Sequence, residues 1–157
     1  MSLLLVRHAR AGRREAWDGD DRLRPLTAKG QHQAQALIGG LWEVIGDARG
    51  PVRMVSSPWL RCRQTLTPLA AFAGAQITSC DDLGEGRGAA AVKLLDSMVG
   101  DTVVLCTHGD VVGEVLESVR RQGVDLGRHP RWPKASTWLL QTRSGAIRSA
   151  RDLAPPA

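Results

Sequence analysis

The chain has 157 residues, of which 43% are hydrophobic and 24% are charged, and its formal net charge is +5. This length suits one domain around one core, and no apolar run approaches the roughly 20 residues that span a bilayer. Arg7 interrupts the short apolar N-terminus, which therefore does not resemble a signal peptide. The composition predicts a single domain over residues 1–157, located in the cytoplasm and without membrane contact.

Composition also limits the classes of molecule that the protein is expected to bind. An excess of positive charge favours anionic partners, from phosphorylated metabolites to nucleic acid and acidic protein surfaces. The chain has no Tyr and one Phe, and aromatic residues do not alternate with basic ones, which disfavours a nucleic-acid stacking platform. The three cysteines, Cys62, Cys80 and Cys106, lack metal-ligand spacing and are expected to be free thiols. We expect a phosphorylated partner and no nucleic acid; the sequence does not indicate an oligomeric state.

The chain begins with an apolar run over residues 3–6 that predicts a buried strand. Residues 9–26 are polar and without periodicity, and a long structureless loop of this kind is usually functional or disordered. Thr27 is a suitable N-cap for a helix with apolar residues at helical spacing up to Ile45.

The remaining chain continues to alternate strands and helices. After a strand at 52–55, Ser57 and Pro58 are the expected N-cap and first residue of a helix. The later predicted elements are a weak strand at 76–79, a loop at 81–88, a helix at 89–98, a strand at 102–107, a helix at 111–121, and a hairpin with strands at 137–142 and 147–150. This order predicts a three-layer α/β/α fold with a mainly parallel sheet and an antiparallel edge.

Charged residues follow three of the predicted strands at their carboxyl ends. Arg7 and His8 follow the first strand, Arg61 lies in the first turn of the helix after the second, and His108 follows the strand at 102–107. Ligands of open α/β sheets bind outside the carboxyl ends of the strands, and helix N-termini and arginine forks both favour phosphate. The sequence therefore predicts a phosphate-binding site at this edge of the sheet.

Three motifs follow one another along the chain: Leu5-Val6-Arg7-His8, Ser56-Ser57-Pro58-x-x-Arg61 with Gln64-Thr65, and Thr107-His108-Gly109. In this order and spacing they resemble the motifs of the histidine phosphatase superfamily, the phosphoglycerate-mutase-like enzymes. The resemblance covers nearly the whole chain. It implies a phosphoglycerate-mutase-like fold and a phosphatase activity that needs no metal or cofactor.

The resemblance also implies roles for the site residues. His8 is the expected nucleophile, which takes the phosphoryl group and forms a phosphohistidine that water hydrolyses. Arg7, Arg61 and His108 are expected to hold the phosphoryl oxygens. The nucleophile must be a neutral imidazole, and the neighbouring arginines disfavour the protonated ring. Glu85 resembles the acidic position of the family and is the expected proton donor to the leaving oxygen.

Two features bear on the substrate. Ala9 directly follows the nucleophile, as in small bacterial phosphohistidine phosphatases, and the short segment between Arg61 and His108 has no room for a lid, so the site should be open. The segment 17–27 instead resembles the phosphatase domain fused to Nudix hydrolases that act on damaged nucleotides. A phosphohistidine protein and a phosphorylated nucleotide or small metabolite are both candidate substrates.

Less specific interpretations also fit the sequence. The chain can be a catalytically idle module that binds phosphate or a phosphoprotein. Arg7 and Arg61 can be paired with Asp110 and Glu85 in structural ion pairs. The basic segment around Trp132 either lies at the rim of the site or covers the edge of the sheet.

Overall fold

The computed structural model describes residues 1–46 and 50–156. Its helices and strands, in chain order, are β1 (Ser2–Arg7), α1 (Ala28–Ile45), β2 (Arg53–Ser56), α2 (Leu60–Ala73), β3 (Ile77–Ser79), α3 (Gly88–Asp96), β4 (Val103–Thr107), α4 (Gly109–Arg121), β5 (Thr137–Arg143) and β6 (Ala146–Leu153). Three short 3-10 turns connect them: η1 (Arg14–Ala16), η2 (Asp21–Leu23) and η3 (Asp81–Leu83).

All six strands form one sheet in the order β3-β2-β4-β1-β5-β6. β1, β2, β3 and β4 run parallel, whereas β5 pairs antiparallel with β1 and β6 pairs antiparallel with β5. The predicted mainly parallel sheet with an antiparallel edge is therefore confirmed. β4 is buried along its whole length, and β1 is buried at all but its terminal residues, which explains why both read as unbroken apolar runs.

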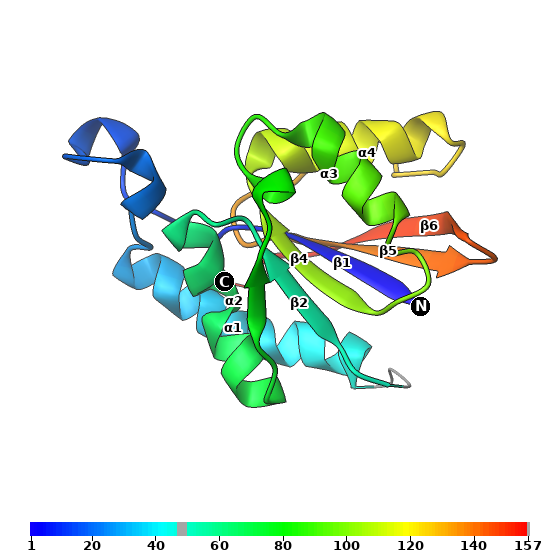
Figure 1. The fold of residues 1–157 in the computed structure, drawn as a ribbon, viewed down its shortest axis with the longest axis horizontal. Coiled ribbons are helices and arrows are strands. Elements are labelled where there is room, and N and C mark those ends of the chain that lie inside the picture. Colours follow the sequence, from blue (N-terminus) through cyan, green and yellow to red (C-terminus); the bar gives the residue numbers. More distant parts are fainter. Residues whose placement is uncertain (47–49, 157) are drawn as a thin grey trace.

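Helices cover both faces of this sheet (Figure 1). α1 and α2 lie on one face, and α3 and α4 lie on the other. Successive side chains of a strand point to opposite faces, so Leu3 and Leu5 of β1 pack with the α3–α4 layer while Leu4 and Val6 pack with the α1–α2 layer. This is the predicted three-layer architecture. None of the described helices is long and apolar enough to cross a membrane.

The start of α2 corrects the prediction made for Ser57 and Pro58. The helix begins at Leu60, after Trp59, and no side chain caps it. The Ser57 hydroxyl lies 2.9 Å from Nε2 of His108 and accepts a hydrogen bond from the Trp59 N–H at 3.2 Å. The predicted N-cap is wrong because the Ser57 hydroxyl contacts His108, the residue that follows β4, and does not cap α2.

The segment 9–26 is also more regular than the structureless loop that the sequence predicts. It contains η1 and η2, and side-chain amides of α1 and α2 hold its main chain. Gln33 accepts a hydrogen bond from the Arg10 N–H and Gln64 accepts one from the Leu26 N–H, both at 2.9 Å. Polar anchoring of this kind produces no hydrophobic periodicity, so the sequence pattern could not show it.

Candidate active site

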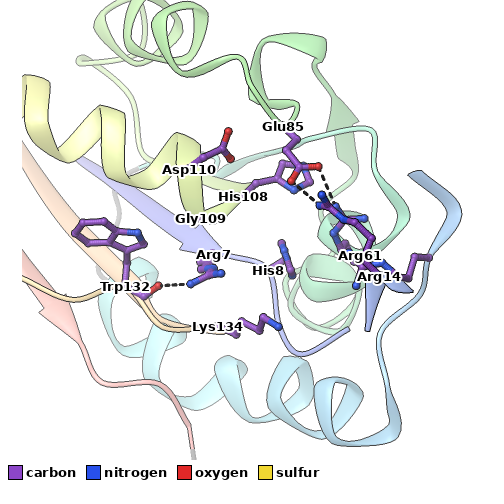
Figure 2. Close-up of a pocket in the computed structure, with 11 residues that line it drawn as sticks. Arg7, His8, Arg14, Arg61, Glu85, His108, Gly109, Asp110, Trp132 and Lys134 are labelled. Atoms are coloured by element: carbon purple, nitrogen blue, oxygen red, sulfur yellow. Dashed lines mark hydrogen bonds and ion pairs between the residues drawn. The ribbon is translucent and has the colours of Figure 1, made fainter. Parts of the chain in front are cut away.

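The carboxyl ends of β1, β2 and β4 surround a cavity of about 320 Å³ (Figure 2). The five site residues predicted from the sequence all line it: Arg7, His8, Arg61, Glu85 and His108. Its other side chains include Arg14, Arg24, Asp110, Trp132 and Lys134. Five of these lining side chains are cationic and two are acidic, so the cavity is suited to an anion.

His8 follows the last residue of β1 and is only 6% exposed. Its Nδ1 lies 2.8 Å from the carbonyl oxygen of Ala9. A carbonyl only accepts hydrogen bonds, so the proton of the neutral ring is on Nδ1 and the lone pair is on Nε2. Burial is the main reason that the pKa of His8 falls to about 3, and the charges of His108, Arg61 and Arg7 lower it further. The ring is therefore neutral at neutral pH, as the sequence predicts, although burial contributes more than the arginines.

Arg7 ends β1 and lies against the first turn of α4. Its Nη1 donates to the main-chain oxygen of Trp132 at 3.0 Å. A Cβ atom at Gly109 would lie 2.7 Å from Cζ of Arg7, so the guanidinium reaches this position only because residue 109 has no side chain. Burial lowers the pKa of Arg7, although the charge of Asp110 opposes this effect. The first residue of α4 thus allows Arg7 to occupy the cavity.

His108 is the residue before α4 and is 2% exposed. Its Nε2 lies 2.9 Å from the Ser57 hydroxyl, and its ring makes an edge contact with His8 at a centroid distance of 5.5 Å. The indole of Trp59 contacts the same imidazole at 5.3 Å. These contacts fix the orientation of the ring, and Nδ1 has no partner among the residues that the structure describes.

Buried nitrogen atoms of the cavity lack partners. Five buried side-chain atoms in the described structure have no hydrogen-bond partner, and three of them are Nε of Arg7, Nε of Arg61 and Nδ1 of His108. An unsatisfied buried donor costs about 1–3 kcal/mol. An anion with several acceptor oxygens would satisfy all three, which supports a phosphoryl group as the ligand.

Glu85 lies on the loop between η3 and α3, and Figure 2 shows its carboxylate beside Arg61 and Arg14. Oε1 is 2.7 Å from Nη2 of Arg14, and Oε2 is 3.5 Å from Nη2 of Arg61. The carboxylate of Asp110 accepts a hydrogen bond from the Gly86 N–H at 2.8 Å and ties this loop to α4. The carboxyl group is therefore held at the cavity by contacts on both sides.

The structure also decides the question of structural ion pairs. Arg61 and Glu85 do form the pair that the sequence suggested. Within the described residues, no ion pair joins Arg7 to Asp110, whose carboxylate instead binds the Gly86 N–H. Among the described residues, the guanidinium of Arg7 therefore has no carboxylate partner, and it can bind an anion without first breaking an ion pair.

Sequence reasoning left some residues of the cavity open and missed others. Trp132 and Lys134 do lie at the site, one of the two positions considered for this segment. Arg24 lines the cavity too, and Asp21 adjoins it through an ion pair with Arg61 at 3.1 Å. Asp21 is one acid among several in segment 9–26, so no local signal distinguishes it.

No group of three or more histidine, cysteine or carboxylate side chains that could hold a metal ion is found among residues 1–46 and 50–156. The three cysteines are free, and Cys62 and Cys106 are buried. The positive charge at the cavity is supplied by arginine and lysine side chains.

The fold and this site match a known family. The sequence model of the histidine phosphatase superfamily (branch 1) matches residues 3–89, which is more than half of the chain. The chain therefore belongs to the histidine phosphatase superfamily.

Individual relatives refine this assignment. The 8-oxo-(d)GTP phosphatase of Mycolicibacterium smegmatis is 34% identical over 161 residues, which cover 99% of this chain and 48% of the relative. The chain thus spans about half the length of that curated relative. Among solved structures, the protein histidine phosphatase SixA complexed with tungstate has a TM-score of 0.73 at 18% identity, over 98% of this chain and 95% of that one. Mycobacterial glucosyl-3-phosphoglycerate phosphatase has a TM-score of 0.67 at 19% identity, over 99% and 98%. At such identities these two structures establish the shared fold.

Proposed function

We propose that the chain is a phosphatase that hydrolyses its substrate through a phosphohistidine on His8. The observation that carries this proposal is the buried, neutral imidazole whose single proton is bound to the Ala9 carbonyl. Its Nε2 lone pair can attack phosphorus in a cavity where three buried nitrogen atoms have no partner among the described residues. A module that only bound phosphate would have no use for a nucleophile kept neutral in this way.

In the first step, Nε2 of His8 forms a bond to phosphorus while the bond from phosphorus to the leaving oxygen breaks. Arg7, Arg61 and His108 offer donors to the phosphoryl oxygens, whose negative charge spreads in the transition state. The carboxyl group of Glu85, in its protonated form, gives its proton to the leaving oxygen. The products are the dephosphorylated molecule and phosphohistidine.

In the second step, a water molecule attacks phosphorus and the bond from phosphorus to Nε2 breaks. The Glu85 carboxylate, held by Arg14 and Arg61, takes the proton of that water. Inorganic phosphate leaves, and His8 returns to its neutral form with the proton on Nδ1. Glu85 has then regained the proton that it gave in the first step.

We propose a phosphorylated nucleotide as the first candidate substrate. The 34% identical relative is named as an 8-oxo-(d)GTP phosphatase. Beside the cavity, and sharing Arg7 and Trp132 with it, lies a shallow groove of about 300 Å³ that is also lined by Pro130, Arg131 and Pro133. An indole and two proline rings suit a flat leaving group such as a nucleoside.

A phosphohistidine protein is the second candidate substrate. The segment between α2 and β4 contains β3, η3 and α3, and its residue Glu85 lines the cavity. Arg14 and Lys134, both exposed, lie at its mouth. A protein surface that presents a phosphorylated side chain can approach such an opening. Assaying nucleoside di- and triphosphates in parallel with phosphohistidine peptides distinguishes the two candidates by their kcat/KM.

Replacement of the nucleophile tests the proposed activity. We expect His8→Ala to lower the hydrolysis of an aryl phosphate by at least about 10³-fold, because the covalent step is lost. His32→Ala is the matched control, since His32 is an exposed histidine on α1. Acid-labile phosphate bound to the wild type and absent from His8→Ala would identify the intermediate. Turnover that survives in His8→Ala would contradict the proposal.

The role of Glu85 is tested with two leaving groups. An alcohol is a poor leaving group and needs a proton, whereas a nitrophenol leaves without one. We expect Glu85→Gln to slow hydrolysis of an alkyl phosphate by about 10²-fold and of a nitrophenyl phosphate by much less. Asp82→Asn is the control, because Asp82 is an acid on the neighbouring η3 whose carboxylate pairs with Arg87. Equal slowing of both substrates would remove Glu85 from the role of acid.

A further inference from the structure

Asp21, the first residue of η2, contacts three arginines of the site. Its Oδ1 is 2.8 Å from Nε of Arg24, and its Oδ2 is 3.1 Å from Nη2 of Arg61 and 3.6 Å from Nη2 of Arg14. Three guanidinium groups that converge on one carboxylate would otherwise repel one another. Asp21 is therefore the shared counter-charge of this part of the cavity.

The contact with Arg61 is the most specific of the three. The main-chain oxygen of Asp21 accepts a hydrogen bond from Nη1 of Arg61 at 2.9 Å, while Oδ2 accepts one from Nη2 at 3.1 Å. One residue thus holds both terminal nitrogens of a guanidinium whose side chain is 1% exposed. Nε of Arg61 is buried and has no partner in the described structure. The arrangement fixes the plane of the guanidinium and leaves its Nε–H available to a ligand.

The carboxylate is itself held in place. Asp20 accepts a hydrogen bond from the Arg22 N–H and so caps η2, and Arg24 bonds to the main-chain oxygen of Gly12. Burial, the largest influence, raises the pKa of Asp21, but the hydrogen bond from Arg24 and the charges of Arg61, Arg24 and Arg14 together hold it below its usual range. Asp21 is therefore an anion at neutral pH.

We propose that Asp21 is a positioning residue of the reaction, which orients Arg61 so that its Nε–H meets the phosphoryl group. Asp21 acts through Arg61 and does not touch the reacting atoms. The inference rests on the proposed phosphatase function and adds a residue of segment 9–26 to the machinery. It also gives this segment a catalytic role that does not depend on the identity of the substrate.

Asp21→Asn tests the proposal through the sign of its effect on phosphate binding. The substitution removes a negative charge, so electrostatics alone predicts that inorganic phosphate binds more tightly. If Asp21 orients Arg61, phosphate instead binds more weakly, and we expect kcat for an aryl phosphate to fall about 10- to 100-fold. Both the dissociation constant of phosphate, from calorimetry, and kcat are measured. Tighter or unchanged phosphate binding overturns the proposal.

Matched variants separate positioning from folding. Asp20→Asn changes the neighbouring acid, and asparagine caps a helical turn as well as aspartate does, so we expect unchanged kcat. Asp21→Glu keeps the charge but displaces the carboxylate, and we expect it to weaken phosphate binding as well. This variant decides the question if Asp21→Asn fails to fold, as judged by thermal unfolding. Wild-type binding constants from Asp21→Glu would show that position is unimportant and would overturn the proposal.

A double-mutant cycle with Arg61→Lys shows whether Asp21 acts through Arg61. Lysine lacks the planar guanidinium whose two terminal nitrogens donate to Asp21. We therefore expect Asp21→Asn to change phosphate binding less than about threefold in the Arg61→Lys background. Fully additive losses overturn the proposal. Wild-type protein that is inactive would refute the proposed function. The contact between Asp21 and Arg61 could still be tested in that case, because the phosphate-binding measurement needs no turnover.

Discussion

The two halves of the cavity are held by different kinds of contact. The strand-borne half consists of Arg7, His8 and His108, at the ends of β1 and β4. The first is half-buried and the other two are at most 6% exposed. The loop-borne half consists of Arg14, Asp21 and Glu85, whose side chains are 29–57% exposed and joined by ion pairs. Backbone register and close packing fix the first half, whereas charge fixes the second.

This difference indicates which part of the site must be rigid before substrate binds. The nucleophile and its neighbours must hold their geometry before substrate arrives, since small displacements of reacting groups are costly. The proton donor acts on a leaving group that differs between substrates, and exposed ion pairs can adjust at little cost because each contributes only about 0–1 kcal/mol. Loss of the nucleophile, in the strand-borne half, should therefore have a larger effect than any single substitution in the loop-borne half.

Among substitutions that keep the nucleophile, the largest effect on an aryl phosphate is expected at Gly109. In Gly109→Ala, the new methyl group would lie 2.7 Å from Cζ of Arg7, so the guanidinium must move out of its position. We expect kcat for an aryl phosphate to fall about 10²-fold with little change in the melting temperature. Gly39→Ala is the control, because nothing lies within 4 Å of the added methyl group on α1. Activity within threefold of the wild type would show that Arg7 tolerates displacement.

The strand-borne half was the part that the sequence could predict. His8 and His108 directly follow apolar runs. A strand that is buried on both faces is apolar throughout, so the first polar residue after the run marks its end. Thr107 pairs with Arg7 in the register of β1 and β4, so the parallel sheet brings the two ends together. Five site residues and the architecture followed from such local signals and from the family motifs.

Glu85 of the loop-borne half followed from the family resemblance, whereas other contacts of the site leave no local signal. Asp21 meets Arg61 forty positions along the chain, and Ser57 meets His108 fifty-one positions along it. In each case the chain offers several side chains of the same chemistry, and only the fold selects one. The predicted N-cap at Ser57 failed for this reason, since a helix cap is a local inference while the actual partner is distant.

Buried His8 gives a second prediction, concerning stability. Its pKa is about 3 in the folded protein, against an ordinary value of 6.5. Between these values the unfolded chain binds the extra proton, so the free energy of unfolding falls as the pH is lowered. From pH 7 to pH 5 we expect His8 to account for a loss of about 2 kcal/mol.

Urea unfolding of the wild type and of His8→Gln at both pH values isolates this contribution, because all other groups titrate alike in the two proteins. The loss should be about 2 kcal/mol smaller in His8→Gln. His32→Gln, which replaces an exposed histidine, should keep the wild-type dependence on pH. Equal pH dependence of the wild type and His8→Gln would mean that the folded protein protonates His8 near its ordinary pKa.

The smallest effect is expected at Arg14, in the loop-borne half. Arg14→Gln removes the 2.7 Å ion pair with Glu85, but the guanidinium is 57% exposed and Arg61 still contacts the other carboxylate oxygen. We expect kcat for an alkyl phosphate to fall less than about fivefold, in keeping with the small energy of exposed pairs. Arg13→Gln is the control, since this neighbouring arginine pairs with Glu15 at 3.8 Å and is 85% exposed. If Arg14→Gln reduced kcat as much as Gly109→Ala does, the loop-borne half would have to be as rigid as the strand-borne half, and the distinction between them would fail.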